Sequence, residues 1–249
     1  MMSFGAFIVA RLSSRRLKQK HMLEILGKPM IEQMICRVAK SKMLDTIILT
    51  TSTDSTDDQL ENLANELNIR CYRGPLNNIM ERVTGAANAF GCDTIVELLG
   101  DNPLVHSELI DDVIKFFIDG GYDYATNVTS EYPLYGLGKQ LFPIGIRVQV
   151  YSTTVANRYR EFPGYINNSS KHPCSFLFDY PNLFDIGYFE AKGPWSFLNK
   201  PDLNFAVNYQ NDLNRIREIF ENCYYVKNNF SLNDVIQYLN IYNFKRSQS

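Results

Sequence analysis

The sequence has no paired cysteines and no long apolar runs. Its five cysteines (Cys36, Cys71, Cys92, Cys174 and Cys223) include no C-x-x-C pair. Their spacing matches no zinc or dithiol redox motif, and scattered unpaired cysteines are typical of the reducing cytosol. No stretch approaches the ~20 apolar residues that a membrane helix needs, and no secretory signal pattern is recognisable. We therefore expect a cytoplasmic protein that has no membrane partner.

The sequence also has little net charge and neither of two common nucleotide motifs. A formal net charge of -2 argues against a nucleic-acid partner. The P-loop pattern G-x-x-x-x-G-K-[ST] and the dinucleotide pattern G-x-G-x-x-G are both absent, which argues against P-loop ATPases and typical dinucleotide-binding enzymes. The hydrophobic content of 45% is ordinary for a globular protein, so a sizeable core is expected.

Short apolar segments alternate with helical patterns through the first half of the chain. This alternation predicts an α/β fold, a three-layer, Rossmann-like and mostly parallel sheet with helices on both faces. The expected strands are Phe7–Ala10, Thr46–Thr51, Ile69–Tyr72, Asp93–Leu99 and Tyr122–Thr126. The expected helices run over about 29–42, 60–67, 78–90 and 107–117, and Gly120 and Gly121 are expected to cap the last of them.

The alternation is lost over residues 127–203. This part is rich in Tyr, Phe, Pro, Asn and Gly and shows one helical pattern, near Thr153–Arg160. We interpret residues 1–249 as a single domain and 127–203 as an inserted α+β lobe that covers a substrate and contacts a partner subunit. A last strand at Phe205–Val207 is expected to return to the sheet, followed by helices at Asp212–Phe220 and Ser231–Leu239.

A basic loop follows the first predicted strand. It carries five cations with two serines among them: Arg11, Arg15, Arg16, Lys18 and Lys20, with Ser13 and Ser14. Such a loop starts at the carboxyl end of a strand, where open α/β sheets bind ligands, and its donors suit phosphate oxygens. On composition alone a solvated turn is the favoured interpretation of this run, and the anion-binding interpretation depends on the rest of the chain.

Asp101 is the carboxylate that best fits a reactive site. It lies directly after the buried strand Asp93–Leu99, between Gly100 and Pro103, where a hard oxygen ligand suits Mg²⁺. The alternative is a turn aspartate that caps the next helix. Because parallel strands end at one edge of a sheet, Arg11, Arg16 and Lys20 are expected to face Asp101 across one crevice. The three histidines, by contrast, are expected to cap helices or lie on the surface.

Five short motifs carry a family resemblance. They are A-R-L-S-S-R-R-L-K-Q-K at 10–20, G-K-P-M at 27–30, R-G at 73–74 with E-R at 81–82, G-D-N-P at 100–103 and V-N-Y-Q-N-D-L at 207–213. In order and spacing the chain resembles the CMP-sugar synthetase superfamily, which includes the acylneuraminate and 3-deoxy-manno-octulosonate cytidylyltransferases. It is most similar to the spore-coat polysaccharide branch, and the match covers most of the first half with a patch near the carboxyl end.

The resemblance implies a Mg²⁺-dependent transfer of CMP from CTP to a small acceptor, with loss of pyrophosphate. It assigns catalytic roles to Arg11, Lys20 and Asp101. Nucleotide binding is assigned to Ala10, Arg11, Ser14, Arg16, Lys20, Gly74, Arg82 and Gly100. Acceptor binding is assigned to Asn102, Arg147, Gln149, Arg160 and Glu161. The metal would be held by Asp101 and, at the position where relatives usually have a second aspartate, by Asn208.

The chain departs from the branch pattern in its metal and acceptor segments. An amide at Asn208 binds Mg²⁺ more weakly than a carboxylate, so the number of metal ions stays open. The usual segment P-D-G-L-D-V-E-V reads here P-I-G-I-R-V-Q-V, which replaces three acidic residues by Ile144, Arg147 and Gln149. We expect an anionic acceptor, a sugar acid, phosphate or phosphonate, held near Arg147.

The sequence leaves open which nucleotide is used and whether the protein is catalytic. The same fold could use another nucleoside triphosphate, because the sequence does not show which base the pocket reads. It could also be a non-catalytic nucleotide-binding relative, for which Asn208 and the altered acceptor segment argue. Members of the superfamily are often dimers through the inserted lobe, so a homodimer is expected.

Overall fold

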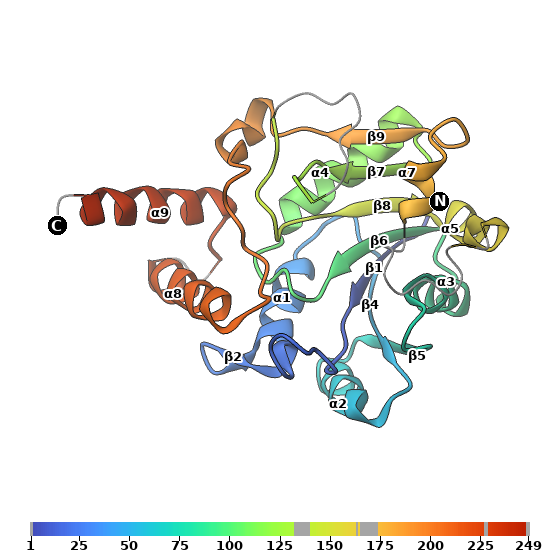
Figure 1. The fold of residues 1–249 in the computed structure, drawn as a ribbon, viewed down its shortest axis with the longest axis horizontal. Coiled ribbons are helices and arrows are strands. Elements are labelled where there is room, and N and C mark those ends of the chain that lie inside the picture. Colours follow the sequence, from blue (N-terminus) through green and yellow to red (C-terminus); the bar gives the residue numbers. More distant parts are fainter. Residues whose placement is uncertain (1, 132–139, 163, 165–173, 227–228, 248–249) are drawn as a thin grey trace.

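The protein folds around one twisted seven-stranded sheet (Figure 1). The computed structural model describes residues 2–131, 140–162, 164, 174–226 and 229–247. Across the sheet the strand order is β5-β4-β1-β6-β8-β7-β9. The strands are β1 (Phe4–Val9), β4 (Thr46–Ser52), β5 (Arg70–Gly74), β6 (Thr94–Leu99), β7 (Tyr124–Asn127), β8 (Gln149–Ser152) and β9 (Ile186–Phe189). A small hairpin, β2 (Glu24–Ile25) with β3 (Lys28–Pro29), precedes the first helix.

The predicted parallel sheet is confirmed, with one reversed strand. Strands β5, β4, β1 and β6 pair in parallel, whereas β8 lies antiparallel between β6 and β7, and β7 pairs in parallel with β9. Segment 127–203, expected as an inserted lobe, therefore contributes β8 and β9 to the main sheet. The residues around β8 consequently meet the end of β6, next to the predicted site.

Helices cover both faces of the sheet and bury the interior strand β1 completely. All six residues of β1 are buried, as expected for a strand between two helical layers. The helices, besides short 3₁₀ turns, are α1 (Met30–Val38), α2 (Asp58–Glu66), α3 (Ile79–Phe90), α4 (Ser107–Gly120), α5 (Thr153–Asn157), α7 (Ser175–Asp179), α8 (Gln210–Val226) and α9 (Leu232–Ser247). Ile8 and Met34 belong to one apolar layer, and Phe7 and Val83 to the other.

The first helix is shorter than predicted. It ends at Val38 instead of near residue 42, because the carboxylate of Asp111 on α4 accepts hydrogen bonds from the backbone N–H groups of Lys42 and Met43. These N–H groups are thereby withdrawn from a helical hydrogen-bond ladder. The glycine cap on α4 is confirmed, since Gly121 adopts a left-handed backbone with φ of 62°.

The strand predicted at Phe205–Val207 is wrong. A single bridge, between Ile144 and Asn204, precedes the segment, which then runs across the end of β6, where Val207 N–H donates to the Asp101 carbonyl at 2.9 Å. It crosses the sheet edge instead of running alongside a strand, so it cannot form a ladder. This path carries Asn208 directly to the carboxyl end of β6.

The two carboxyl-terminal helices are longer than expected, and α9 extends away from the sheet (Figure 1). The predicted cap at Ser231 is confirmed: Ser231 Oγ accepts from Asp234 N–H, and the Asp234 carboxylate accepts from Ser231 N–H. Among the described residues, every helix is too short or too polar to cross a membrane.

Candidate active site

Two loops start side by side at the carboxyl edge of the sheet. Strands β1 and β6 are in register up to Val9 and Leu99, and Gly100 N–H donates to the Val9 carbonyl at 2.9 Å. A Cβ at Gly100 would lie 3.0 Å from that same carbonyl oxygen and 3.1 Å from His21. Glycine therefore lets the chain pass closely between the end of β1 and the basic loop.

Lys20 and Asp101 meet between these two loops. Lys20 Nζ lies 2.6 Å from Asp101 Oδ2, 2.8 Å from the Val207 carbonyl oxygen and 3.4 Å from Asn208 Oδ1. The lysine side chain is 6% exposed and that of Asp101 is 21% exposed. An ammonium group removed from water and surrounded by oxygens is held in one position, which suits it to act on a bound anion.

The backbone around this cluster is fixed by two aspartates that sequence reasoning missed. The buried Asp57 accepts from Leu12 N–H at 2.7 Å and from Ser52 N–H at 3.1 Å, which fixes the start of the basic loop. Asp212, in the first turn of α8, accepts from the N–H groups of Asn208 and Tyr209. Both residues lie in polar turns, and nothing in the sequence distinguishes them from exposed aspartates that cap helices.

His21 is buried beside the cluster, contrary to its expected place on the surface or at a helix cap. Burial, and secondarily the positive charge of Lys20, lowers its pKa from 6.5 to about 4, so its imidazole is neutral at pH 7. A hydrogen bond with the backbone of Arg11 ties the ring to the basic loop. His106 does cap a helix, accepting from Glu108 N–H at the start of α4. His172 lies outside the described residues.

The lowered pKa of His21 predicts an acid-sensitive fold. Between about pH 6.5 and 4 the unfolded chain binds a proton at His21 and the folded protein does not, so stability falls as the pH falls, by up to about 3 kcal/mol from this group. The slope disappears below about pH 4. Denaturant unfolding of wild type and His21→Gln across this range should give a shallower pH dependence for the variant. Parallel curves would contradict the assignment.

Arg82 on α3 is buried with incomplete hydrogen bonding. It is 1% exposed, and its Nε and Nη1 have no hydrogen-bond partner among the described residues. Burial, and secondarily the charge of Arg11, lowers its pKa to about 10, so it stays cationic at pH 7. Gly74 makes room for its stem, since a Cβ there would lie 3.1 Å from Arg82 Cγ. An unsatisfied buried guanidinium is costly and points to a missing anionic or polar ligand.

Arg147 and Gln149 lie in a buried polar network on the neighbouring strands. Arg147 Nη2 donates to Gln149 Oε1 at 2.6 Å, and Gln149 Nε2 donates to Glu97 Oε1 at 3.3 Å. The other Glu97 oxygen accepts from the hydroxyl of Tyr151. Burial raises the pKa of Glu97, an effect that the charge of Arg147 and these hydrogen bonds partly offset. Glu97 was not anticipated, although a single carboxylate within an apolar strand is a recognisable signal.

Four further predicted residues lie in or near the loops that carry Lys20, Asp101 and Asn208. Arg16 lies with its guanidinium 5.9 Å from the Tyr209 ring, one residue from Asn208. Ala10 and Asn102 are buried in the turns after β1 and β6, whereas Arg11 is exposed and Ser14 is partly exposed.

Arg160 and Glu161 are the least supported of the predicted residues. Arg160 bonds Asn157 and Glu161 pairs with Arg158, and no described contact links either residue to Arg147. Their assignment to the acceptor stays a prediction, as do all the site roles.

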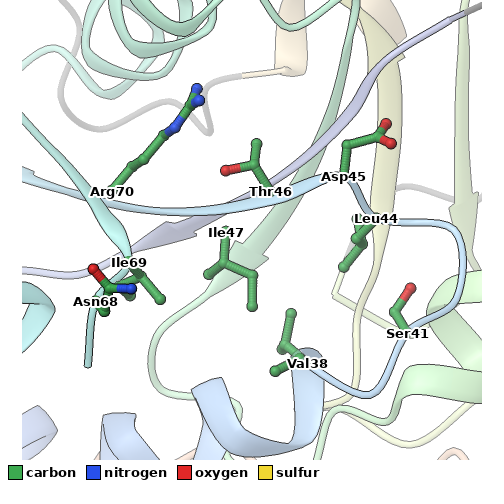
Figure 2. Close-up of a pocket in the computed structure, with 10 residues that line it drawn as sticks. Val38, Ser41, Leu44, Asp45, Thr46, Ile47, Asn68, Ile69 and Arg70 are labelled. Carbon is green, nitrogen blue, oxygen red and sulfur yellow. The ribbon is translucent and has the colours of Figure 1, made fainter.

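A pocket lies at the opposite edge of the sheet (Figure 2). It is lined by residues that precede or begin β4 and β5, among them Asp45, Thr46 and Arg70, together with the end of α1. In parallel α/β sheets the amino edge serves stability and the carboxyl edge binds ligands. Asp45 is already engaged, accepting from Phe4 N–H at 2.8 Å. The Lys20–Asp101 cluster at the carboxyl edge is therefore the stronger candidate.

Known proteins share the fold and about a quarter or less of the aligned sequence at full length. A sequence model described as Cytidylyltransferase matches residues 6–229. The spore coat polysaccharide biosynthesis protein SpsF of Bacillus subtilis is 24% identical over 218 residues, which cover 86% of this chain and 85% of that protein. A cytidylyltransferase structure from Leptospira borgpetersenii aligns with a TM-score of 0.84 at 20% identity, covering 98% of this chain and 96% of the other.

A further solved structure is a synthetase of CMP:2-keto-3-deoxy-manno-octonic acid complexed with CTP. It aligns with a TM-score of 0.64 at 16% identity over 88% of this chain and 99% of the other. Together with the sheet and the family match, these findings define the class of protein as a nucleotidyltransferase with a Rossmann-like fold. The chain belongs to the cytidylyltransferase family. A homodimer and a cytoplasmic location stay predictions.

Proposed function

We propose that this cytidylyltransferase transfers CMP from CTP to a small anionic acceptor, with Mg²⁺ bound at Asp101 and release of pyrophosphate. The observation that carries the proposal is the contact of Lys20 with Asp101 and Asn208 at the carboxyl edge of the sheet. A cation for phosphate and oxygens for a metal stand there within one hydrogen-bonded cluster.

In the proposed reaction an acceptor oxygen attacks the α-phosphorus of CTP. The bond from this oxygen to phosphorus forms, the bond from phosphorus to the oxygen bridging the β-phosphate breaks, and pyrophosphate leaves with the electron pair. Where the attacking oxygen belongs to a hydroxyl, its proton passes to water. Arg11, Ser14, Arg16 and Lys20 hold the triphosphate, and Lys20 neutralises charge that develops on its oxygens. The unsatisfied N–H groups of Arg82 bind an oxygen of the nucleotide.

The residues fit a magnesium ion that is held mainly by the nucleotide. Within the described part of the chain, no three His, Cys, Asp or Glu side chains are grouped to hold a metal. Asp101 and Asn208 offer one carboxylate and one amide oxygen, and Mg²⁺ commonly takes one or two protein ligands with phosphate and water as the others. When bound, the ion supplies charge neutralisation at the phosphate oxygens.

Asn208→Asp should strengthen metal binding. A carboxylate at 208 adds a second charged oxygen beside Asp101, so the Mg²⁺ concentration for half-maximal activity is expected to fall roughly tenfold. Titrating activity with Mg²⁺ at saturating CTP measures this. Asn211→Asp, an exposed residue in the first turn of α8, is the matched control for added charge. An unchanged Mg²⁺ requirement in Asn208→Asp would remove residue 208 from the metal site.

The acceptor is assigned to the side of the crevice next to Arg147. The segment that carries Arg147 bonds to the segment that carries Asn208, through Phe205 N–H and the Ile144 carbonyl at 2.7 Å. Arg147 is 1% exposed, and its charge acts strongly on an anion entering the crevice because water screens it little. This placement supports a carboxylate, phosphate or phosphonate on the acceptor.

The proposal is tested by pyrophosphate release. CTP, ATP, GTP and UTP are each incubated with the protein, with and without Mg²⁺, and with a panel of sugar acids, sugar phosphates and phosphonates. Release that requires CTP, Mg²⁺ and an anionic acceptor is expected. Tight CTP binding without pyrophosphate release, whichever acceptor is added, would identify a non-catalytic nucleotide-binding protein. Pyrophosphate release with another nucleotide would show that the enzyme uses that nucleotide instead of CTP.

A further inference from the structure

Gln149 stands at the centre of the buried network and connects its charged members. Its amide oxygen accepts from the Tyr124 hydroxyl at 2.7 Å and from Arg147 Nη2 at 2.6 Å. Its amide nitrogen donates to Glu97 Oε1 at 3.3 Å. The side chains of Gln149 and Glu97 are completely buried, and the two residues lie opposite each other on β8 and β6.

The orientation of the Gln149 amide follows from its neighbours. A guanidinium can only donate hydrogen bonds, so the group facing Arg147 must be the oxygen, and the nitrogen then faces the Glu97 carboxylate. The reversed amide would place a donor against Arg147 and an acceptor against Glu97. One arrangement therefore satisfies all these contacts, which holds the Arg147 guanidinium in a single place.

The neutrality of Gln149 matters as much as its geometry. It stands between a guanidinium and a carboxylate, and it contacts Arg147 without contributing a negative charge. A carboxylate at this position would pair directly with Arg147, and in a buried, weakly screened site it would cancel most of the attraction for an incoming anion. The amide fixes the cation and adds no negative charge of its own to that which Glu97 already contributes.

We propose that Gln149 is a positioning residue that aims Arg147 at the acceptor anion and that its neutral amide sets the preference of the pocket for anionic acceptors. This inference rests on the proposed function. It adds a specificity role for Gln149 that depends on Glu97 and Tyr124, the two residues that complete the amide's hydrogen bonds.

The central test compares Gln149→Glu with the double variant Glu97→Gln/Gln149→Glu. The single variant should raise the KM for an anionic acceptor roughly tenfold or more, with the KM for CTP unchanged. The double variant restores the wild-type net charge but keeps a carboxylate against Arg147, so the raised KM should persist. Recovery of the wild-type KM in the double variant would show that only total buried charge matters and would overturn the proposal.

Two further measurements keep the test decisive. Gln149→Met retains size and neutrality but loses the contact with Arg147; its acceptor KM should also rise, and an unchanged value would overturn the positioning role. Thermal unfolding of each variant identifies any that fails to fold, in which case the remaining variants decide.

Binding of inorganic phosphate to the CTP-loaded protein, followed by calorimetry, separates this inference from the proposed function. Wild type should bind phosphate and Gln149→Glu should bind it roughly tenfold more weakly. This result would support the inference even if no acceptor in the panel reacts, a case in which the proposed reaction alone fails. Equal phosphate affinities, or no phosphate binding by wild type, would overturn the inference.

Discussion

Lys20→Met is expected to lower kcat by about 10²- to 10³-fold, the usual cost of removing one fixed electrostatic group from a transition state. Methionine fills similar space but has no charge to place against the phosphate oxygens. The ammonium group of wild type is already fixed by three oxygens, including Asp101 Oδ2 at 2.6 Å. Steady-state pyrophosphate release at saturating CTP and acceptor measures the loss.

Lys18→Met is the matched control, because Lys18 lies in the same loop and is exposed. It removes the same charge from the protein without touching the cluster, so its kcat should stay within about twofold of wild type. Thermal unfolding of both variants checks the fold. Similar losses in the two variants would mean that the loop acts through its overall charge, and no loss in Lys20→Met would exclude Lys20 from the reaction.

Arg82→Met is expected to weaken CTP binding roughly 10- to 100-fold while stabilising the protein without ligand by about 1–3 kcal/mol. The two effects have one cause. In the described part of the chain the buried guanidinium has no hydrogen-bond partner for Nε or Nη1, which costs free energy that methionine would not cost. In the complex, the nucleotide is expected to satisfy those donors, and methionine cannot.

The opposite signs of the two changes make this prediction specific. Denaturant unfolding without nucleotide gives the stability, and calorimetric titration gives the CTP affinity. Arg70→Met is the control, since Arg70 is exposed at the amino edge of the sheet and bonds the Phe90 carbonyl. Loss of stability in Arg82→Met with unchanged CTP affinity would show that the arginine is a structural residue.

The parallel half of the sheet could be predicted because its signals are local. Each of β1, β4 and β6 is a short apolar run followed by a polar loop, and the ends of such strands meet at one edge. The position of β8 could not be predicted in this way. This strand lies in the segment where the alternation of strands and helices is lost, so no regular pattern indicates that it runs antiparallel between β6 and β7.

The candidate site, like the sheet, could be predicted only in part from the sequence. The meeting of Lys20 with Asp101 follows from charged residues at the ends of two neighbouring strands, and the structure places them in contact. His21 and Asp57 were missed because nothing in a polar loop tells which side chains become buried. The strand at 205–207 was wrongly predicted for a related reason, since a short apolar run looks like a strand whether or not a partner edge is available.

The most direct test of the central claim follows the phosphorus atoms of CTP. CTP labelled at either the α- or the γ-phosphate is incubated with acceptor and Mg²⁺, using wild type and Lys20→Met. The account predicts that wild type moves the α-label to the acceptor and releases the γ-label as pyrophosphate, and that Lys20→Met does so at a small fraction of this rate. Transfer of the γ-label to the acceptor, or equal transfer of the α-label by both proteins, would contradict it.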